Sequence, residues 1–103
     1  MSDKAERKRR LKAWKTGERE KARARFPLQD GILEAFFADL ERRFAAEGCF
    51  HDTRHAQRAI DALRLSDHDA NALLDWCGDH GGHCDCEIAA NAQQHWIENR
   101  VDT

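Results

Sequence analysis

The residues best suited to metal or thiol chemistry lie in two short segments. The first reads CFH at 49–51, and the second reads CDC at 84–86, just after a glycine pair. Thiolate and imidazole are ligands that zinc accepts in tetrahedral geometry, and soft sulfur favours zinc over magnesium or calcium. If the two segments lie side by side, the sequence predicts a zinc site whose ligands are Cys49, His51, Cys84 and Cys86.

Other interpretations of these residues stay open. His55, His80 and His83 compete with His51 for the fourth ligand position. Cysteine is also among the most buried residue types, and Cys77 falls on the apolar stripe of a predicted helix, so we expect Cys77 to belong to the core.

An enzyme that depends on zinc or on a thiol pair is a further alternative, with Glu87 as a conceivable base. The sequence contains neither an H-E-x-x-H motif nor the βαβ pattern of a thioredoxin-like protein. It also lacks a G-x-S-x-G elbow and a glycine-rich phosphate loop. We therefore expect a binding or structural role rather than catalysis.

The spacing of the CDC segment constrains its backbone. Residues i and i+2 of a helix point about 200° apart, whereas on an extended chain they share one face. The sequence therefore predicts a short extended or turned element around residues 83–88, which Gly81 and Gly82 make accessible.

The rest of the chain predicts a mainly α single domain of four to five helices. The strongest helix starts at Asp30 as its N-cap and stops at Gly48. Further helices are expected after Asp52 or Thr53, after a Ser66 cap, and along the tail, where a short strand before the helix is the alternative. Apolar residues at helical spacing mark the buried faces: Leu33, Phe36, Phe37, Leu40 and Phe44, then Ala56, Ile60 and Leu63, then Ala70, Leu73 and Leu74, and finally Ile88, Ala92 and Trp96.

The charge distribution divides the chain into a basic helical arm, 1–26, and an acidic helical domain, 27–103. The arm is rich in good helix formers, and we expect Pro27 to end its helix. The arm holds eleven Lys/Arg and four Asp/Glu, a net of +7, and the remainder has a net of −9. Such an arm suits contact with phosphates, so we expect RNA or the ribosome as an anionic partner. A protein partner or a homodimer formed through the arm is the alternative. The predicted contact residues are Arg7, Lys8, Arg9, Arg10, Lys12, Trp14 and Lys15.

Length and hydropathy predict a small cytoplasmic protein. At 103 residues, one modest core is expected, for which a bound metal would be a substantial stabilising contribution. No apolar run follows the charged beginning, so we expect neither a signal peptide nor a membrane span. In that compartment, four cysteines indicate free thiols or metal ligands rather than disulfides.

Two stretches, GCFHDTRHAQRAIDAL and LLDWCGDHGGHCDCEI, resemble a bacterial family known as domain of unknown function 2695. The resemblance rests on Cys49, His51, Thr53 and Arg54, and on the Gly-Gly-x-Cys-Asp-Cys-Glu ending at 81–87, and it covers roughly residues 4–92. This chain departs from the family pattern by placing Asp52 between His51 and Thr53. The resemblance implies a common fold and a shared site, without an assigned activity.

Overall fold

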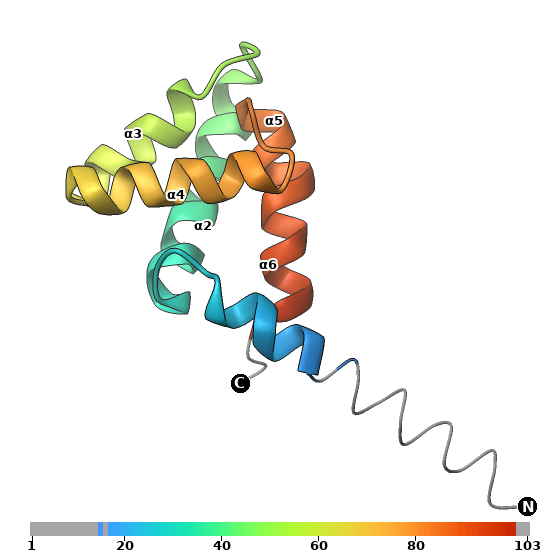
Figure 1. Ribbon diagram of the computed structural model, residues 1–103. Helices are drawn as coiled ribbons and strands as arrows, with labels where there is room; N and C mark the ends of the chain where they lie inside the picture. Colours follow the sequence, from blue (N-terminus) through green and yellow to red (C-terminus); the bar gives the residue numbers. More distant parts are fainter. Residues whose placement is uncertain (1–14, 16, 101–103) are drawn as a thin grey trace, which may run out of the picture.

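The described chain is helical and contains no strand. The computed structural model describes residue 15 and residues 17–100 (Figure 1). Residues 17–24 are helical and end before Pro27, as the sequence predicts. The following elements are α2 (Asp30–Glu47), α3 (Arg54–Ala62), α4 (Asp67–Asp79), α5 (Asp85–Glu87), the π-helical turn η1 (Ile88–Ala92) and α6 (Gln93–Asn99). The mainly α prediction is confirmed.

Helix α2 supplies the largest apolar face of the core. Leu33, Phe36, Phe37 and Leu40 are all buried, as the stripe predicts, whereas Phe44 at the end of the stripe is only half-buried. Gly48 ends the helix with a φ of 76°, and its N–H donates to the Phe44 carbonyl at 2.7 Å.

The predicted start of α2 is displaced by one residue. Gln29 is the N-cap, and Asp30 is the first helical residue. The Asp30 carboxylate accepts a hydrogen bond from the indole Nε1 of Trp96 at 3.3 Å, so it links α2 to α6. The side chain of Asp30 therefore serves a contact between helices rather than an N-cap.

The caps of α3 and α4 follow the sequence. Thr53 precedes α3, and the hydroxyl of Ser66 accepts from the Asp69 N–H at 3.1 Å at the start of α4. In Figure 1, α4 crosses α2, while the segment from α5 to α6 runs beside α2. The tail is helical, so the alternative with a strand is wrong.

Aromatic rings fill the space between these helices. Phe37 of α2 lies 5.2 Å from Trp96 and 6.4 Å from Trp76, measured between ring centroids. Phe26, from the turn after helix 17–24, meets Trp76 edge-on at 5.8 Å. Aromatic pairs at such separations add about 0.5–1.5 kcal/mol beyond the burial of their area.

Helix 17–24, which belongs to the predicted basic arm, is tied to the end of α6. Arg23 donates to the carbonyl of Asn99 at 3.1 Å, and Arg19 donates to that of Arg100 at 3.3 Å. These carbonyls lie at a helix C-terminus, where cations are favourable. Residues 1–14 and 16 lie outside the described residues, so a separate arm over 1–26 stays a prediction.

The extended element predicted around 83–88 is shorter than expected. Cys84 has extended angles, with φ −144° and ψ 169°, and α5 starts at the next residue. Cys84 is the N-cap, and its carbonyl accepts from the Ile88 N–H at 2.9 Å. Side chains at i and i+2 point about 200° apart only when both residues are helical. Cys84 is a non-helical cap residue, so its side chain can lie over the first turn of α5, beside that of Cys86.

The close approach of the chain at Gly82 gives a test of this packing. A Cβ at this position would lie 2.8 Å from Cγ1 of Ile88 and 2.9 Å from the Cys77 carbonyl oxygen. We expect Gly82→Ala to lower the free energy of unfolding by about 1–3 kcal/mol, measured by urea denaturation.

Gly31 is the matched control. It lies in the first turn of α2, and a Cβ there would meet nothing within 4 Å. Gly31→Ala should raise stability by about 0.5–1 kcal/mol. Equal effects of the two substitutions would contradict the packing at Gly82.

Candidate metal centre

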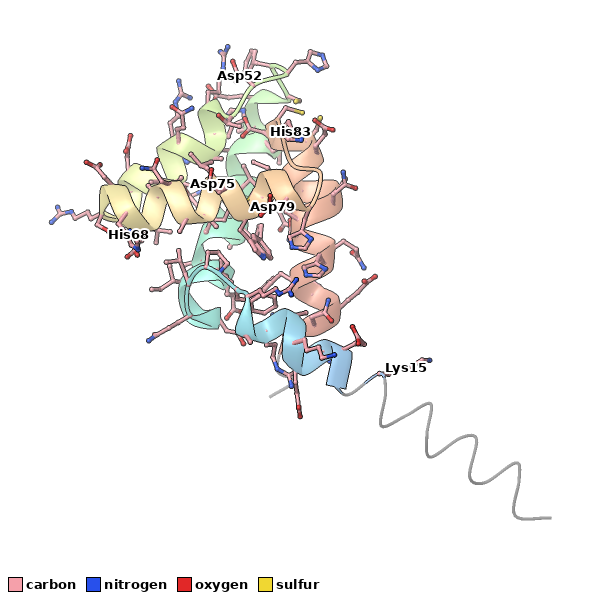
Figure 2. All side chains as sticks on the ribbon, viewed as in Figure 1. Lys15, Asp52, His68, Asp75, Asp79 and His83 are labelled. Carbon is pink, nitrogen blue, oxygen red and sulfur yellow. The ribbon has the colours of Figure 1, made fainter. Side chains whose placement is uncertain are left out.

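Three cysteines from distant parts of the sequence converge at one end of the molecule. Cys49 lies in the loop between α2 and α3, while Cys84 and Cys86 lie at the start of α5. Their Sγ atoms all lie within 4.8 Å of one another, and those of Cys84 and Cys86 are 3.2 Å apart. Figure 2 shows yellow sulfur atoms where this loop approaches α5. The sequence expectation that the two segments meet is thereby met for the three thiols.

These separations are close to what a thiolate-bound zinc requires. Sulfur atoms about 2.3 Å from a tetrahedral zinc lie about 3.8 Å from each other. The cysteine cluster, defined as Cys49, Cys84 and Cys86, therefore needs only small side-chain adjustments to coordinate one ion. Cys49 and Cys86 are half-buried and Cys84 is buried, so an ion there would be largely screened from solvent.

Two of the three thiols have pKa values shifted in opposite directions. The pKa of Cys49 is lowered, because the N–H of His51 donates to its sulfur at 3.3 Å and because the Cys86 thiol bonds to it. The pKa of Cys86 is raised to about 12, because its thiol bonds to Cys84 and to Cys49 and because a second negative charge beside them is unfavourable. A metal ion would have to displace these protons, so its binding should weaken as the pH falls.

The buried carboxylate of Asp85 holds the CDC segment in place. Its two oxygens accept from the backbone N–H groups of His55 and Ala56 at 3.0 Å each, in the first turn of α3. The N–H of Asp85 donates in turn to the carbonyl of Asp52 at 2.8 Å. Three hydrogen bonds thus bring Cys84 and Cys86 against the loop that carries Cys49.

A buried histidine fixes the other side of the cluster. The His55 ring is completely buried, and Nε2 donates to the Gly48 carbonyl at 2.8 Å. Its Nδ1 lies 3.6 Å from a carboxylate oxygen of Glu47. His55 therefore orients the glycine that precedes Cys49, and it is a positioning residue rather than a ligand in this arrangement.

The remaining candidates for a fourth ligand lie outside the cluster. Among the described residues, no histidine joins the three cysteines. The exposed His51 has a φ of 61°, which is uncommon for a residue with a side chain. His80 is stacked on His95, with ring centroids 3.8 Å apart, and His83 is exposed. His51 as a ligand stays a prediction.

Other sequence expectations have mixed outcomes. Cys77 is completely buried, as expected, and burial raises the pKa of its thiol to about 12. His95, which the sequence analysis did not single out, is half-buried in a ring stack with His80. The roles of Asp85 and His55 have no sequence signal, since both depend on contacts about 30 residues apart in the chain or on the fold of the loop. Of the predicted arm contacts, Lys15 is exposed, and Arg7, Lys8, Arg9, Arg10, Lys12 and Trp14 lie outside the described residues.

Replacement of Asp85 by asparagine should disturb the whole site. An amide offers one acceptor oxygen where two N–H donors now bond, so one buried donor would face an NH2 group. We expect Asp85→Asn to lower the free energy of unfolding by about 2–4 kcal/mol, as for loss of buried hydrogen bonds to a charged group. Chemical denaturation measures this change.

Asp52→Asn is the control for loss of a carboxylate in the same loop. Asp52 pairs with Arg54 at 2.9 Å on the surface, and exposed ion pairs are worth about 0–1 kcal/mol. If Asp52→Asn lowered the free energy of unfolding as much as Asp85→Asn, the buried hydrogen bonds of Asp85 would not be the cause of the larger expected loss.

Comparison with known proteins identifies a family and several relatives of this chain. The chain matches the family described as "Protein of unknown function (DUF2695)" over residues 36–91, a range that includes all three cysteines of the cluster. It is 32% identical over 95 residues to the uncharacterised proteins Rv2271 of Mycobacterium tuberculosis and Mb2294 of Mycobacterium bovis, which covers 92% of this chain and 93% of each relative. No solved structure matches this chain. On the family match and on these relatives, the chain belongs to the DUF2695 family.

Proposed function

We propose that this protein is a small cytoplasmic binding module whose C-terminal half is stabilised by zinc. The observation that carries the proposal is the convergence of three thiols within 4.8 Å, from two segments 35 residues apart. Zinc on Cys49, Cys84 and Cys86 would join the loop before α3 to the start of α5. His51 is the candidate fourth ligand, because it is exposed and only two residues from Cys49.

The size of the protein supports a stabilising role for the metal. A single core in a chain of this length supplies only a small surplus of stability, and a structural metal is a common supplement. The ion would link Cys49 to Cys84 and so close a long loop of the chain. Closing a loop removes conformational entropy from the unfolded state, which stabilises the folded state.

Within the described part of the chain, every helix is too short or too polar to span a membrane.

Zinc content is the direct test of the metal proposal. Protein purified without chelator should contain about one zinc per chain, and Cys84→Ser should lose it. Cys77→Ala is the matched control, because it removes the one cysteine outside the cluster and should keep the metal. Chelation should lower the melting temperature of the wild type. A zinc-free protein with an intact fold and four free thiols would refute the proposal.

We further propose that the basic arm gives the module its anionic partner. The sequence of residues 1–26 has a net charge of +7, and Lys and Arg bind phosphates with release of counterions. Structured RNA, including that of the ribosome, is the partner that this chemistry favours. Use of the arm for dimerisation or for docking to a protein is the alternative.

Charge reversal separates these functions of the arm. Replacing Arg9, Arg10 and Lys12 by Glu should abolish RNA binding that weakens steeply with salt in the wild type. Replacing Arg42 and Arg43 by Glu is the control, since it changes positive charges on α2 instead. RNA binding that survives the arm substitution would refute the RNA proposal, and a mass that rises with concentration only when the arm is intact would support dimerisation.

A further inference from the structure

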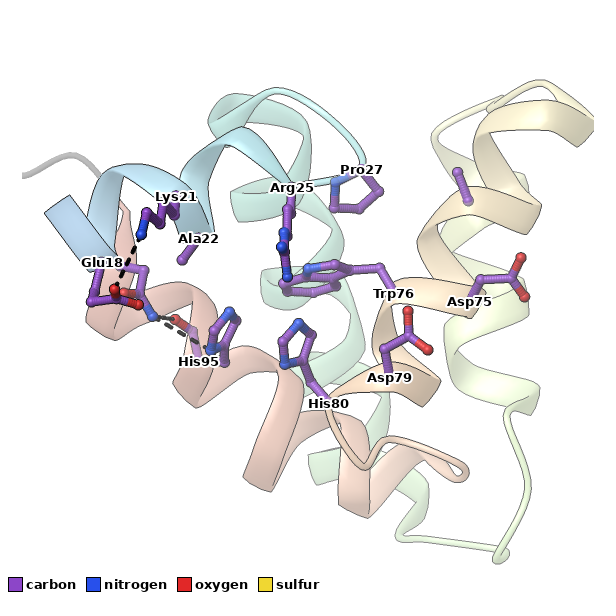
Figure 3. A pocket seen from close by; sticks show the side chains of 12 residues that line it. Glu18, Lys21, Ala22, Arg25, Pro27, Asp75, Trp76, Asp79, His80 and His95 are labelled. Carbon is purple, nitrogen blue, oxygen red and sulfur yellow. Dashed lines mark hydrogen bonds and ion pairs between the residues drawn. The ribbon is translucent and has the colours of Figure 1, made fainter.

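A second site lies apart from the cysteine cluster, where helix 17–24 faces α4 and α6. Figure 3 shows this pocket, which has a volume of about 810 Å³. Ligand pockets for small molecules have volumes of about 300–1,000 Å³ and commonly lie between helices. None of the residues that line it belongs to the cysteine cluster. The pocket therefore has the size of a binding site and no part in metal binding.

The floor of the pocket consists of stacked aromatic rings. His80 and His95 stack with centroids 3.8 Å apart and planes inclined by 17°, and Trp76 lies 5.1 Å from His80. Burial and the neighbouring His80 lower the pKa of His95, which favours its neutral ring. Trp76 is only 6% exposed, and its indole Nε1 has no hydrogen-bond partner among the described residues. A flat ring is the group that such a floor would bind.

Opposite charges flank this floor. Arg25 comes from the turn after helix 17–24, and Asp75 and Asp79 come from α4. Lys21 of the same helix also lines the pocket, where it pairs with Glu18 at 3.5 Å. In Figure 3, the Arg25 side chain points toward Trp76 and His80, while Asp79 and Asp75 lie on the other side of these rings. Within the described part of the chain, Arg25, Asp75 and Asp79 have no ion-pair partner, so their charges are available to a ligand.

This arrangement excludes simple ligand classes. A bare anion would be attracted by Arg25 but repelled by the two aspartates, and a bare cation would meet the reverse. A purely apolar molecule would desolvate the five charged groups of the lining without replacing their hydrogen bonds. An aromatic amino acid carries both of its charges on one carbon and cannot place them on opposite sides of the rings. The fitting molecule has an anionic end, a flat ring, and hydrogen-bond donors at the far edge of that ring.

We propose that the pocket binds a nucleoside monophosphate whose base carries an exocyclic amine. The phosphate would bind Arg25, the base would pack on the rings of Trp76, His80 and His95, and the amine would donate to Asp75 or Asp79. The same chemical unit exists as a free nucleotide and as an unpaired residue of single-stranded RNA. The inference depends neither on zinc nor on residues 1–14.

The test follows the indole N–H signal of Trp76 by NMR during titration of the full-length protein. Adenosine and cytidine monophosphates should shift this signal. Uridine monophosphate, which lacks the amine, and inorganic phosphate, which lacks the base, should each bind at least about tenfold more weakly, as expected for loss of a charge-assisted hydrogen bond or of the ring contact. Equal binding of inorganic phosphate, or no shift at millimolar nucleotide, would overturn the proposal.

Variants at exposed positions keep the fold intact and assign the two ends of the ligand. Arg25→Glu should lower the affinity for adenosine monophosphate by about tenfold or more, whereas Arg42→Glu on α2 should leave this affinity unchanged. The double change of Asp75 and Asp79 to Asn should reduce the preference for adenosine over uridine monophosphate. Unchanged affinity in Arg25→Glu would overturn the proposal.

A short oligoadenylate distinguishes the two sources of the nucleotide. Binding through the same Trp76 signal, tighter than that of the free nucleotide and weakened by salt, would support an RNA residue. Tighter binding of the free nucleotide would support a small-molecule ligand. Reversal of Arg9, Arg10 and Lys12 to Glu changes none of the pocket residues named above, so it should leave free-nucleotide binding intact even if RNA binding by the arm fails.

Discussion

The hydrogen bonds from the start of α3 to the buried carboxylate of Asp85 are the contact on which the candidate metal centre depends. Thr53, the N-cap of α3, makes no side-chain cap of its own, so Asp85 supplies acceptors from 30 residues away. A buried carboxylate is stable only when it is bonded. This requirement joins the CDC segment to the loop of Cys49 and couples the geometry of the thiols to the folding of the domain.

A set of aromatic residues joins the pocket to the core. Trp96 packs on Phe37 and bonds to Asp30, which fixes α6 against α2. Trp76 packs on the same phenylalanine and also forms the floor of the pocket. The pocket shares no lining residue with the cysteine cluster, so the two are separate sites on one domain.

The basic charge near the N-terminus serves the fold as well as any partner. Arg19 and Arg23 bond to carbonyls at the end of α6, whereas Lys21 and Arg25, on the same helix and the turn after it, line the pocket. The basic residues of this segment therefore have different roles: some stabilise the fold and others line the pocket. In helix 17–24, residues two positions apart face different parts of the molecule.

Local patterns in the sequence determined the helices, their caps and the buried stripes, because helix periodicity and capping depend on residues within a few positions. They also identified two segments whose thiols would form a metal site if the segments lay side by side. Only the tertiary structure decided how they meet: Cys84 as an N-cap above α5, Asp85 bonded to α3, and His51 outside the cluster. The pocket was likewise beyond the sequence, because the stack of His80 on His95 depends on the packing of α4 against the tail helix. Contacts of this kind follow from long-range packing, which has no signature in the spacing of neighbouring residues.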